Sequence, residues 1–208
     1  MVLFSGLFFI LAALLWVIVY VRNKENELKC CTLLVLGSGG HTAELLSFAG
    51  GLSAAYSPRV YVIAKTDQIS EKKARCVEAE RTKSARQPAD FFVETLPRAR
   101  EVGQSYVTSV FTTLIALLAS IRVVLKHCPQ LVICNGPGTC IPICFVAGFV
   151  QLLMRQRTAL VFVESICRTQ TLSLSGKILY YGHIARVIVQ WPELLKLYPR
   201  AEYLGLLS

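Results

Sequence analysis

Along most of the chain, short apolar runs alternate with longer segments whose apolar residues recur at helical spacing. The short runs have too few residues for helices, which predicts buried strands. They lie at 32–36, 59–64, 90–96, 130–135, 158–164 and 186–190, with a last one near 201–204. The helical segments lie between them, at 42–52, 67–83, 104–127, 142–156 and 175–182. This alternation is typical of βαβ units, so we expect an α/β domain with helices on both faces of a parallel sheet.

The N-terminal region has a different pattern. Residues 2–21 carry no charge and are long enough to cross a bilayer as one helix. Arg22, Lys24 and Lys29 follow directly, so the positive-inside rule places the rest of the chain in the cytosol. A cleaved signal peptide is the alternative, but it would need a basic start and a small-residue cleavage site. The predicted organisation is a transmembrane anchor at 1–21, a linker at 22–30 and a folded domain at 31–208.

Composition narrows the classes of partner. The formal net charge of +9 suggests an anionic partner, such as nucleic acid, a phosphorylated ligand or a lipid headgroup. The basic residues are spread along the chain without an arginine-rich tract, which argues against nucleic acid. The eight cysteines include no C-x-x-C pair, so we expect neither a zinc site nor a thioredoxin-like site. Several lie in apolar segments, where a reduced thiol packs as a small hydrophobic group.

The first predicted strand ends in GSGGHT, residues 37–42, directly before a helix. Glycines let the backbone approach a ligand, and the start of a helix offers free N–H groups, so the loop predicts a phosphate cradle. It is neither the dinucleotide fingerprint, whose third glycine is replaced by Thr42, nor a P-loop. His41 can bind a phosphate oxygen there or accept a proton from an attacking hydroxyl. A purely structural imidazole is an equal alternative.

Three other strand ends carry unusual residues. CNGPGTC, residues 134–140, is a candidate ligand or interface loop, although a tight turn also explains its composition. VESICR places Glu164 at a strand end, where it can hold a sugar hydroxyl or act in acid–base chemistry; a helix cap or a salt bridge is an equal alternative. In LPRAR, Arg98 and Arg100 can face an anionic lipid or a diphosphate. The candidate loop residues are Asn135, Gly136, Pro137, Gly138, Thr139 and Arg168.

The helical segments at 104–127 and 142–156 are unusually apolar, yet neither is a clean bilayer span. Arg122 interrupts the first, and the second is short and contains Pro142 and Gln151. Packing on the sheet is the default expectation, and a face half-embedded in the membrane is the alternative.

Seven segments in order, GSGGHT, YSPRVYVIAKTD, LPRAREVGQS, CNGPGTC, VESICR, TLSLSGKILY and VQWPEL, resemble the family of membrane-anchoring subunits of the endoplasmic-reticulum UDP-N-acetylglucosamine transferase. The resemblance runs from about residue 31 to the C-terminus. It implies a Rossmann-like domain similar to the N-terminal, acceptor-binding half of a GT-B glycosyltransferase such as the bacterial lipid II enzyme. It further implies that the donor-binding half is a separate catalytic subunit, and that the acceptor is dolichyl-diphosphate-N-acetylglucosamine.

The resemblance also implies roles for particular residues. His41 matches a proposed base for the sugar 4-hydroxyl, and Glu164 matches an acidic residue after a later strand. Ser165 and Ile166 replace the glutamine and asparagine of the bacterial relative, so we transfer no acceptor-sugar contacts. The residues expected around the acceptor diphosphate are Gly37, Ser38, Gly39, Gly40 and Thr42. The tail expected to dock on the catalytic subunit is Tyr203, Leu204, Gly205, Leu206, Leu207 and Ser208.

The favoured hypothesis is thus an acceptor-presenting subunit of a heteromeric transferase in the endoplasmic-reticulum membrane, with one span and a cytosolic domain. A self-sufficient membrane enzyme on a phosphorylated or diphosphate-lipid substrate is the alternative, but the chain has no G-x-S-x-G, D-x-D or H-E-x-x-H motif. A pure scaffold with a vestigial ligand loop is a third. We expect no metal or cofactor to be bound by this chain.

Overall fold

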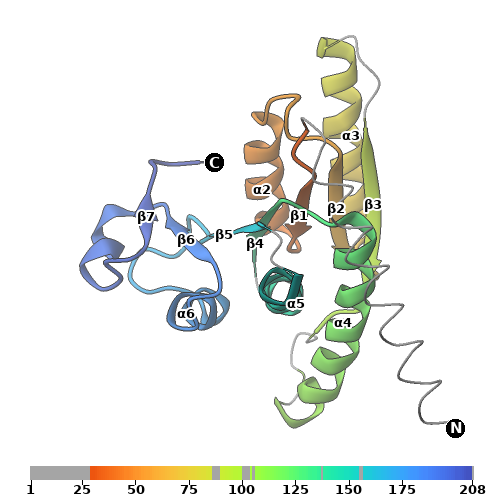
Figure 1. Cartoon of the computed structure of the whole chain (residues 1–208). Coiled ribbons are helices and arrows are strands. Elements are labelled where there is room, and N and C mark those ends of the chain that lie inside the picture. The colour runs from red at the N-terminus through yellow and green to blue at the C-terminus, as the bar shows by residue number, and fades with distance from the viewer. Residues whose placement is uncertain are drawn as a thin grey trace, which may run out of the picture.

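The structure is a computed structural model that describes residues 29–85, 90–99, 104, 106–136, 138–154 and 157–207 (Figure 1). The predicted anchor at 1–21 and nearly all of the linker at 22–30 lie outside these residues. The transmembrane anchor therefore stays a prediction from the sequence.

Seven parallel strands form one sheet, in the order β3-β2-β1-β4-β5-β6-β7 (Figure 1). The strands are β1 (Thr32–Leu36), β2 (Arg59–Ala64), β3 (Phe91–Leu96), β4 (Leu131–Asn135), β5 (Ala159–Val163), β6 (Arg186–Val189) and β7 (Glu202–Tyr203). All seven lie where the sequence predicted strands. The sheet is parallel throughout, as βαβ connections require.

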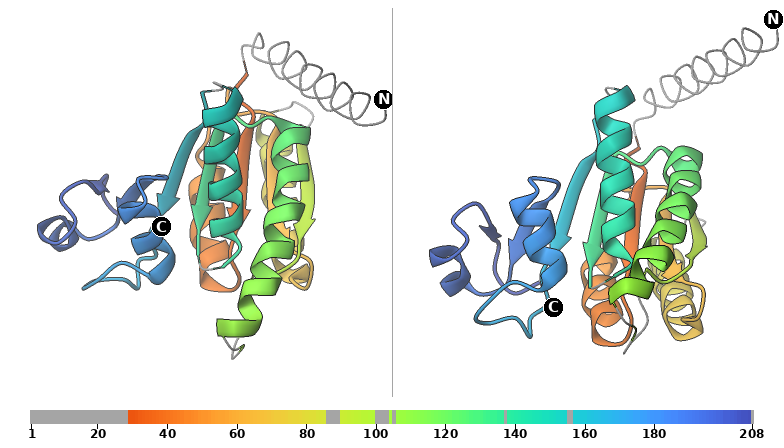
Figure 2. Two further views of the ribbon diagram at one scale, coloured as in Figure 1. Left: turned by 60° about the horizontal axis from the view of Figure 1, so that its bottom comes forward. Right: turned by 90° about the horizontal axis from the view of Figure 1, so that it is seen from below.

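Helices cover both faces of this sheet. They are α2 (Gly40–Gly50), α3 (Gln68–Ala85), α4 (Tyr106–His127), α5 (Cys140–Met154), α6 (Leu174–Tyr181) and the 3₁₀-helix η1 (Pro192–Lys196). Figures 1 and 2 show α2 and α3 on one face and α4, α5 and α6 on the other. The five predicted helical segments are confirmed, with ends shifted by a few residues.

The central strand β1 shows why the predicted strands are continuous apolar runs. Its residues point alternately to the two faces: Leu33 and Val35 pack in the core beneath α4, α5 and α6. Leu34 and Leu36 pack in the second core beneath α2 and α3. Because both faces are covered, every position in the strand is buried. Burying each such side chain contributes about 1.5–3 kcal/mol.

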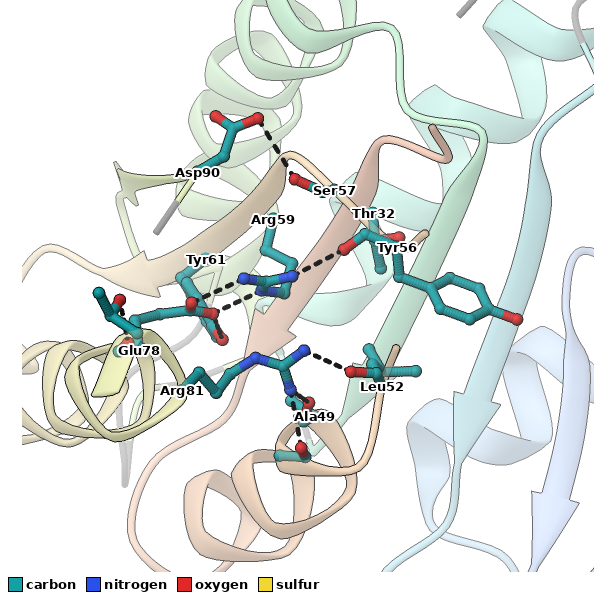
Figure 3. Close-up of polar contacts among 12 residues, drawn as sticks. Thr32, Ala49, Leu52, Tyr56, Ser57, Arg59, Tyr61, Glu78, Arg81 and Asp90 are labelled. Carbon is teal, nitrogen blue, oxygen red and sulfur yellow. Dashed lines mark hydrogen bonds and ion pairs between the residues drawn. The ribbon is translucent and has the colours of Figure 1, made fainter. Parts of the chain in front are cut away.

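A buried ionic cluster attaches α3 to the sheet (Figure 3). The Arg59 guanidinium on β2 donates to both carboxylate oxygens of Glu78 on α3, at 2.6 and 2.8 Å. The Tyr61 hydroxyl donates to Glu78 Oε1 at 2.6 Å. From the same helix, Arg81 donates to the carbonyls of Ala49, Gly50 and Leu52 at the end of α2. The cluster therefore fixes α2 and α3 relative to β2.

The chain reverses its winding direction between β1 and β4. These strands are neighbours in the sheet, but α2, which follows β1, covers one face, while α5, which follows β4, covers the other. The connections leave the carboxyl ends of the two strands in opposite directions. In open parallel sheets, ligands bind at such a topological switch point.

Candidate functional site

Two glycine-containing loops meet at this switch point. A Cβ atom on Gly37, just after β1, would lie 2.7 Å from His41 Cβ and 2.9 Å from the carbonyl oxygen of Asn135. Gly136, just after β4, has a φ of +115°, and its Cβ would lie 3.2 Å from Gly37 Cα. Both positions require glycine because the two loops pack backbone against backbone. This close approach brings the GSGGHT and CNGPGTC motifs together.

A chain of side-chain hydrogen bonds crosses the switch point. His41 Nδ1, in the first turn of α2, lies 2.8 Å from Asn135 Oδ1 at the end of β4. Asn135 Nδ2 donates to Glu44 Oε2 at 2.9 Å, and Ser165 Oγ donates to Glu44 Oε1 at 2.8 Å. These hydrogen bonds join three of the four motifs singled out in the sequence, those at the ends of β1, β4 and β5. Glu44 was not predicted, although it stands three residues after His41 on the same helix face.

Thr42 turns away from the loop's outer surface. Its hydroxyl donates to the Gly37 carbonyl and lies 2.7 Å from Ser70 Oγ on α3. The side chain is buried, so it braces the glycine loop from within. Ser38, Gly39 and Gly40 are exposed, and Gly39 precedes α2 with a φ of +66°. Of the predicted diphosphate loop, these three residues face solvent.

Glu164 is 2% exposed and lies at the start of α6. Its Oε2 accepts the backbone N–H of Ser173 at 2.7 Å, and its Oε1 accepts that of Ser165 at 3.2 Å. A Cβ on Gly176 would lie 2.5 Å from Oε2, so α6 packs directly on the carboxyl group. Burial raises the pKa of Glu164, although these N–H donors oppose the shift. Glu164 thus holds the backbone of Ser173, the residue whose hydroxyl caps α6 by accepting the Gly176 N–H, and the catalytic role of Glu164 remains a prediction.

A cavity of about 450 Å³ opens beside the glycine loop, over the carboxyl ends of β1, β2 and β3. It is lined by Ser38, Gly39, Thr66, Asp67, Gln68, Ile69, Ser70, Lys73 and Arg98. Asp67 accepts hydrogen bonds from the backbone N–H and the hydroxyl of Ser70, which occupy its carboxylate. Arg98 was singled out in the sequence as a group that can face a diphosphate, and Lys73 was not. The cavity brings both cations beside Ser38 and Gly39.

The remaining predicted residues lie around this region. Thr139 is buried at the start of α5, Gly138 has a φ of +64°, and Pro137 lies outside the described residues. The Arg168 side chain is exposed, and its backbone N–H donates to the Ser165 carbonyl at 2.9 Å. Within the described part of the chain, no group of three or more His, Cys, Asp or Glu side chains is arranged to hold a metal ion.

The C-terminal tail is exposed at its apolar side chains. Tyr203, Leu204 and Leu206 are at least 41% exposed. Leu207 packs against the core beneath α2 and α3, and its N–H donates to Gln190 Oε1 at 3.2 Å. Ser208 lies outside the described residues. The tail is thus attached at Leu207 while it presents three apolar side chains.

Helices α4 and α5 lie side by side (Figure 2). Both helices expose large apolar side chains. In the described part of the chain, α4 is the one helix long and apolar enough to cross a membrane, over Ser109–His127. In the apolar stretch of this helix, 28% of the residues are buried. The exposed residues are Val110, Phe111, Leu114, Ile115, Leu118 and Ile121 on α4 and Phe145, Phe149, Leu152 and Leu153 on α5. The two helices therefore pack on the sheet through one side only.

Comparison with known proteins identifies the family. The family model described as "Oligosaccharide biosynthesis protein Alg14 like" matches residues 32–207, which is nearly the whole folded domain. The chain belongs to the Alg14 family. The Rattus norvegicus protein named UDP-N-acetylglucosamine transferase subunit ALG14 is 46% identical over 97% of this chain and 94% of the relative. Relatives of the same name from Homo sapiens and Yarrowia lipolytica are 44% and 38% identical, over 92% and 89% of this chain and 89% and 84% of their own.

A solved structure supports the fold of this Alg14-family chain. MurG of Acinetobacter baumannii superposes with a TM-score of 0.51 at 16% sequence identity. The match covers 79% of this chain but 42% of MurG. It confirms the predicted fold class, a Rossmann-like domain equivalent to one half of a GT-B protein. The family predicted from the seven sequence segments is confirmed as well.

Proposed function

We propose that this Alg14-family chain is the membrane-anchored, acceptor-presenting subunit of a UDP-N-acetylglucosamine transferase, and that a separate catalytic subunit binds the nucleotide sugar. The relatives' names describe a subunit of such a transferase. The observation that carries the proposal is the His41–Asn135 pair at the switch point of a domain that matches less than half of a GT-B protein. Such a domain supplies one wall of an active-site cleft, and the partner supplies the other.

The acceptor in this proposal is dolichyl-diphosphate-N-acetylglucosamine, held at the carboxyl end of the sheet. Its diphosphate lies against Ser38, Gly39 and Gly40, with Lys73 and Arg98 of the adjacent cavity as counter-charges. Backbone N–H groups at the start of a helix and cationic side chains are the groups that bind phosphate oxygens most strongly. The cavity supports this placement because it joins the glycine loop to two cations from other elements.

His41 is the proposed general base for the second N-acetylglucosamine transfer. The 4-hydroxyl proton of the acceptor sugar moves to the imidazole as the hydroxyl oxygen bonds to the anomeric carbon of the donor. The bond from that carbon to UDP breaks, and UDP leaves with the electron pair. A positioned base contributes about 10²–10⁴-fold to such a step. The half-buried position of His41 at the switch point supports this role.

The exposed face of α4 and α5 is the proposed contact with the cytosolic surface of the membrane. A lipid-linked acceptor enters from the bilayer, and this face offers apolar side chains that insert between headgroups. Arg122, in the C-terminal half of α4, and Arg157, beyond α5, are exposed and can pair with anionic headgroups. Together with the predicted anchor at 1–21, this contact orients the cleft relative to the bilayer, in the endoplasmic reticulum.

The tail is the proposed docking segment for the catalytic subunit. The side chains of Tyr203, Leu204 and Leu206 are exposed. Tyr203 ends the edge strand β7, which has only two residues, and Leu204 and Leu206 follow it. Apolar and aromatic side chains of this kind form the centres of protein interfaces. Deletion of 203–208 is expected to abolish recovery of the catalytic subunit with the chain from detergent-solubilised membranes.

The test of the proposal is sugar transfer from UDP-N-acetylglucosamine to phytanyl-diphosphate-N-acetylglucosamine, with the full chain alone and with the catalytic subunit added. Activity only in the mixture supports the split enzyme. Activity from this chain alone would show a donor site within it, and would favour the self-sufficient enzyme instead.

A further inference from the structure

We propose that Glu44 and Asn135 are positioning residues that fix the tautomer of His41, so that its Nε2 is the nitrogen that accepts the proton. The inference rests on the proposed function of His41 as the general base. It assigns to Glu44 and Asn135 a role in the reaction that does not require either side chain to touch the acceptor.

The argument begins at Glu44, because a carboxylate can only accept hydrogen bonds. Its two oxygens receive different donors: Asn135 Nδ2 at 2.9 Å on Oε2, and Ser165 Oγ at 2.8 Å on Oε1. The NH₂ group of Asn135 must therefore face Glu44. The reversed amide would place a carbonyl oxygen against a carboxylate oxygen, and the Asn135 side chain is fully buried, so water cannot compensate.

The orientation of Asn135 then determines the state of His41. With its NH₂ group facing Glu44, Asn135 presents its carbonyl oxygen to His41 Nδ1, at 2.8 Å. A carbonyl oxygen accepts only, so Nδ1 must carry the hydrogen. In neutral imidazole the other nitrogen, Nε2, then has the free lone pair. No protein atom in the described part of the chain makes a hydrogen bond with Nε2.

This sequence of contacts prepares His41 for one direction of proton transfer. The proton of the acceptor hydroxyl passes to Nε2, and the positive charge that forms on the ring is adjacent to a polar chain that ends in a carboxylate. The opposite tautomer, with hydrogen on Nε2, cannot accept that proton. A base held in the wrong tautomer loses much of its catalytic effect even where the geometry is preserved.

The test uses a swap that exchanges the amide and the carboxylate. In Glu44→Gln, the new amide can donate to Asn135, so Asn135 is free to reverse and place its NH₂ group against His41 Nδ1. In the double variant Glu44→Gln/Asn135→Asp, the amide introduced at position 44 donates to the carboxylate introduced at position 135. The second oxygen of that carboxylate accepts from His41 Nδ1–H. The double variant therefore restores an acceptor-only group opposite His41 Nδ1 at constant formal charge, while the hydrogen bond between positions 44 and 135 runs in the reverse direction.

Two measurements are made on the complex with the catalytic subunit. Turnover is followed with UDP-N-acetylglucosamine and phytanyl-diphosphate-N-acetylglucosamine. The His41 tautomer is read from ¹⁵N NMR of histidine-labelled chain, which has three histidines, and the His41 signal is assigned by its loss in His41→Gln. Melting temperature and recovery of the partner establish that each variant is folded.

We expect His41→Gln to lower kcat about 100-fold or more, and Glu44→Gln to lower it at least about tenfold with little change in KM. The Glu44→Gln spectrum should show hydrogen on Nε2, and the double variant should recover both the native tautomer and most of the turnover. Ser165→Ala, which leaves the Glu44–Asn135 contact in place, should have a smaller effect than Glu44→Gln.

The outcomes separate the two proposals. If His41→Gln retains full turnover, the assignment of His41 as the base is wrong. If His41→Gln is inactive but Glu44→Gln keeps native turnover and tautomer, or if the wild-type chain carries hydrogen on Nε2, only the positioning role is overturned. A double variant that stays as slow as the single one would also contradict it.

Discussion

Arg59 and Glu78 form a two-point ion pair between β2 and α3, and both side chains are almost completely buried. Burial alone raises the pKa of Glu78, but hydrogen bonds from Arg59 and Tyr61 outweigh it and lower the pKa below its ordinary value. Removal of one partner leaves the other charge buried without compensation. We therefore expect Glu78→Gln to cost about 3–5 kcal/mol of stability at neutral pH.

The lowered pKa of Glu78 determines how the stabilisation by this ion pair depends on pH. Because the folded-state pKa is lowered, the stabilisation is fully present above the unfolded pKa of about 4.3 and is lost as the pH falls through the folded pKa. The melting temperatures of the full-length wild type and Glu78→Gln in detergent should therefore begin to converge as the pH falls below about 4.3, and should meet only below the folded-state pKa. Glu80→Gln, an exposed position on the same helix, is the control and should melt like the wild type. A Glu78→Gln variant with native melting temperature at neutral pH would contradict the prediction.

Lys73 is expected to contribute to acceptor binding rather than to turnover. Lys72 and Lys73 are both exposed, but only Lys73 lines the cavity beside the glycine loop. A hydrogen bond to a charged group contributes about 1.5–3 kcal/mol, which corresponds to roughly 10- to 100-fold in binding. Lys73→Gln should raise KM for the diphosphate acceptor by about tenfold or more and leave KM for UDP-N-acetylglucosamine unchanged. Equal effects of Lys73→Gln and Lys72→Gln on KM would show that the cavity is not part of the acceptor site.

Glu164→Gln distinguishes a structural role, holding the cap residue Ser173 of α6, from an acid–base role. A glutamine oxygen can still accept the Ser173 N–H, so the start of α6 should be retained. If Glu164 has only these structural contacts, Glu164→Gln should keep turnover within a few-fold of the wild type. Glu164→Ala removes the acceptor and should cost about 1–2 kcal/mol of stability. A loss of turnover of about 100-fold in a folded Glu164→Gln variant would instead establish a catalytic role.

The face of α4 and α5 should contact lipid. A fluorescent residue introduced at Leu118, which is 62% exposed on α4, should shift to shorter emission wavelengths when the full chain is reconstituted in nanodiscs. Lipid-borne quenchers should reduce its emission. The same residue at Lys72, on α3 and the opposite face of the sheet, should report water (Figure 2). Equal emission at the two positions would place α4 away from the bilayer.

The strands and helices were predictable because each buried parallel strand is a short apolar run between polar or glycine-rich segments. His41 and Asn135 were identified for a similar reason: both stand at strand ends, where polar residues and glycines interrupt an apolar pattern. The sequence also placed Arg98 among the groups that can meet a diphosphate, and the structure puts it in the cavity.

Other parts of the site depend on contacts between elements that are distant in sequence. In the sequence, Glu44 does not differ from other glutamates on helices. Its partners Asn135 and Ser165 meet its carboxylate only in the folded domain. Thr42 belongs to the glycine loop, but Ser70 on α3 draws its hydroxyl inward. Lys73 lines the cavity beside the loop because α3 packs on the sheet, where the Arg59–Glu78 pair is one of its attachments. Local spacing carries no signal for any of these contacts.

The most direct measurement of the central claim is ligand binding by the full chain in nanodiscs, without the catalytic subunit. If this chain is the acceptor half of the transferase, it should bind phytanyl-diphosphate-N-acetylglucosamine and should not bind UDP-N-acetylglucosamine. Lys73→Gln should weaken the acceptor binding, and Lys72→Gln should leave it unchanged. Binding of the nucleotide sugar without the acceptor would contradict the claim, because it would place the donor site on this chain.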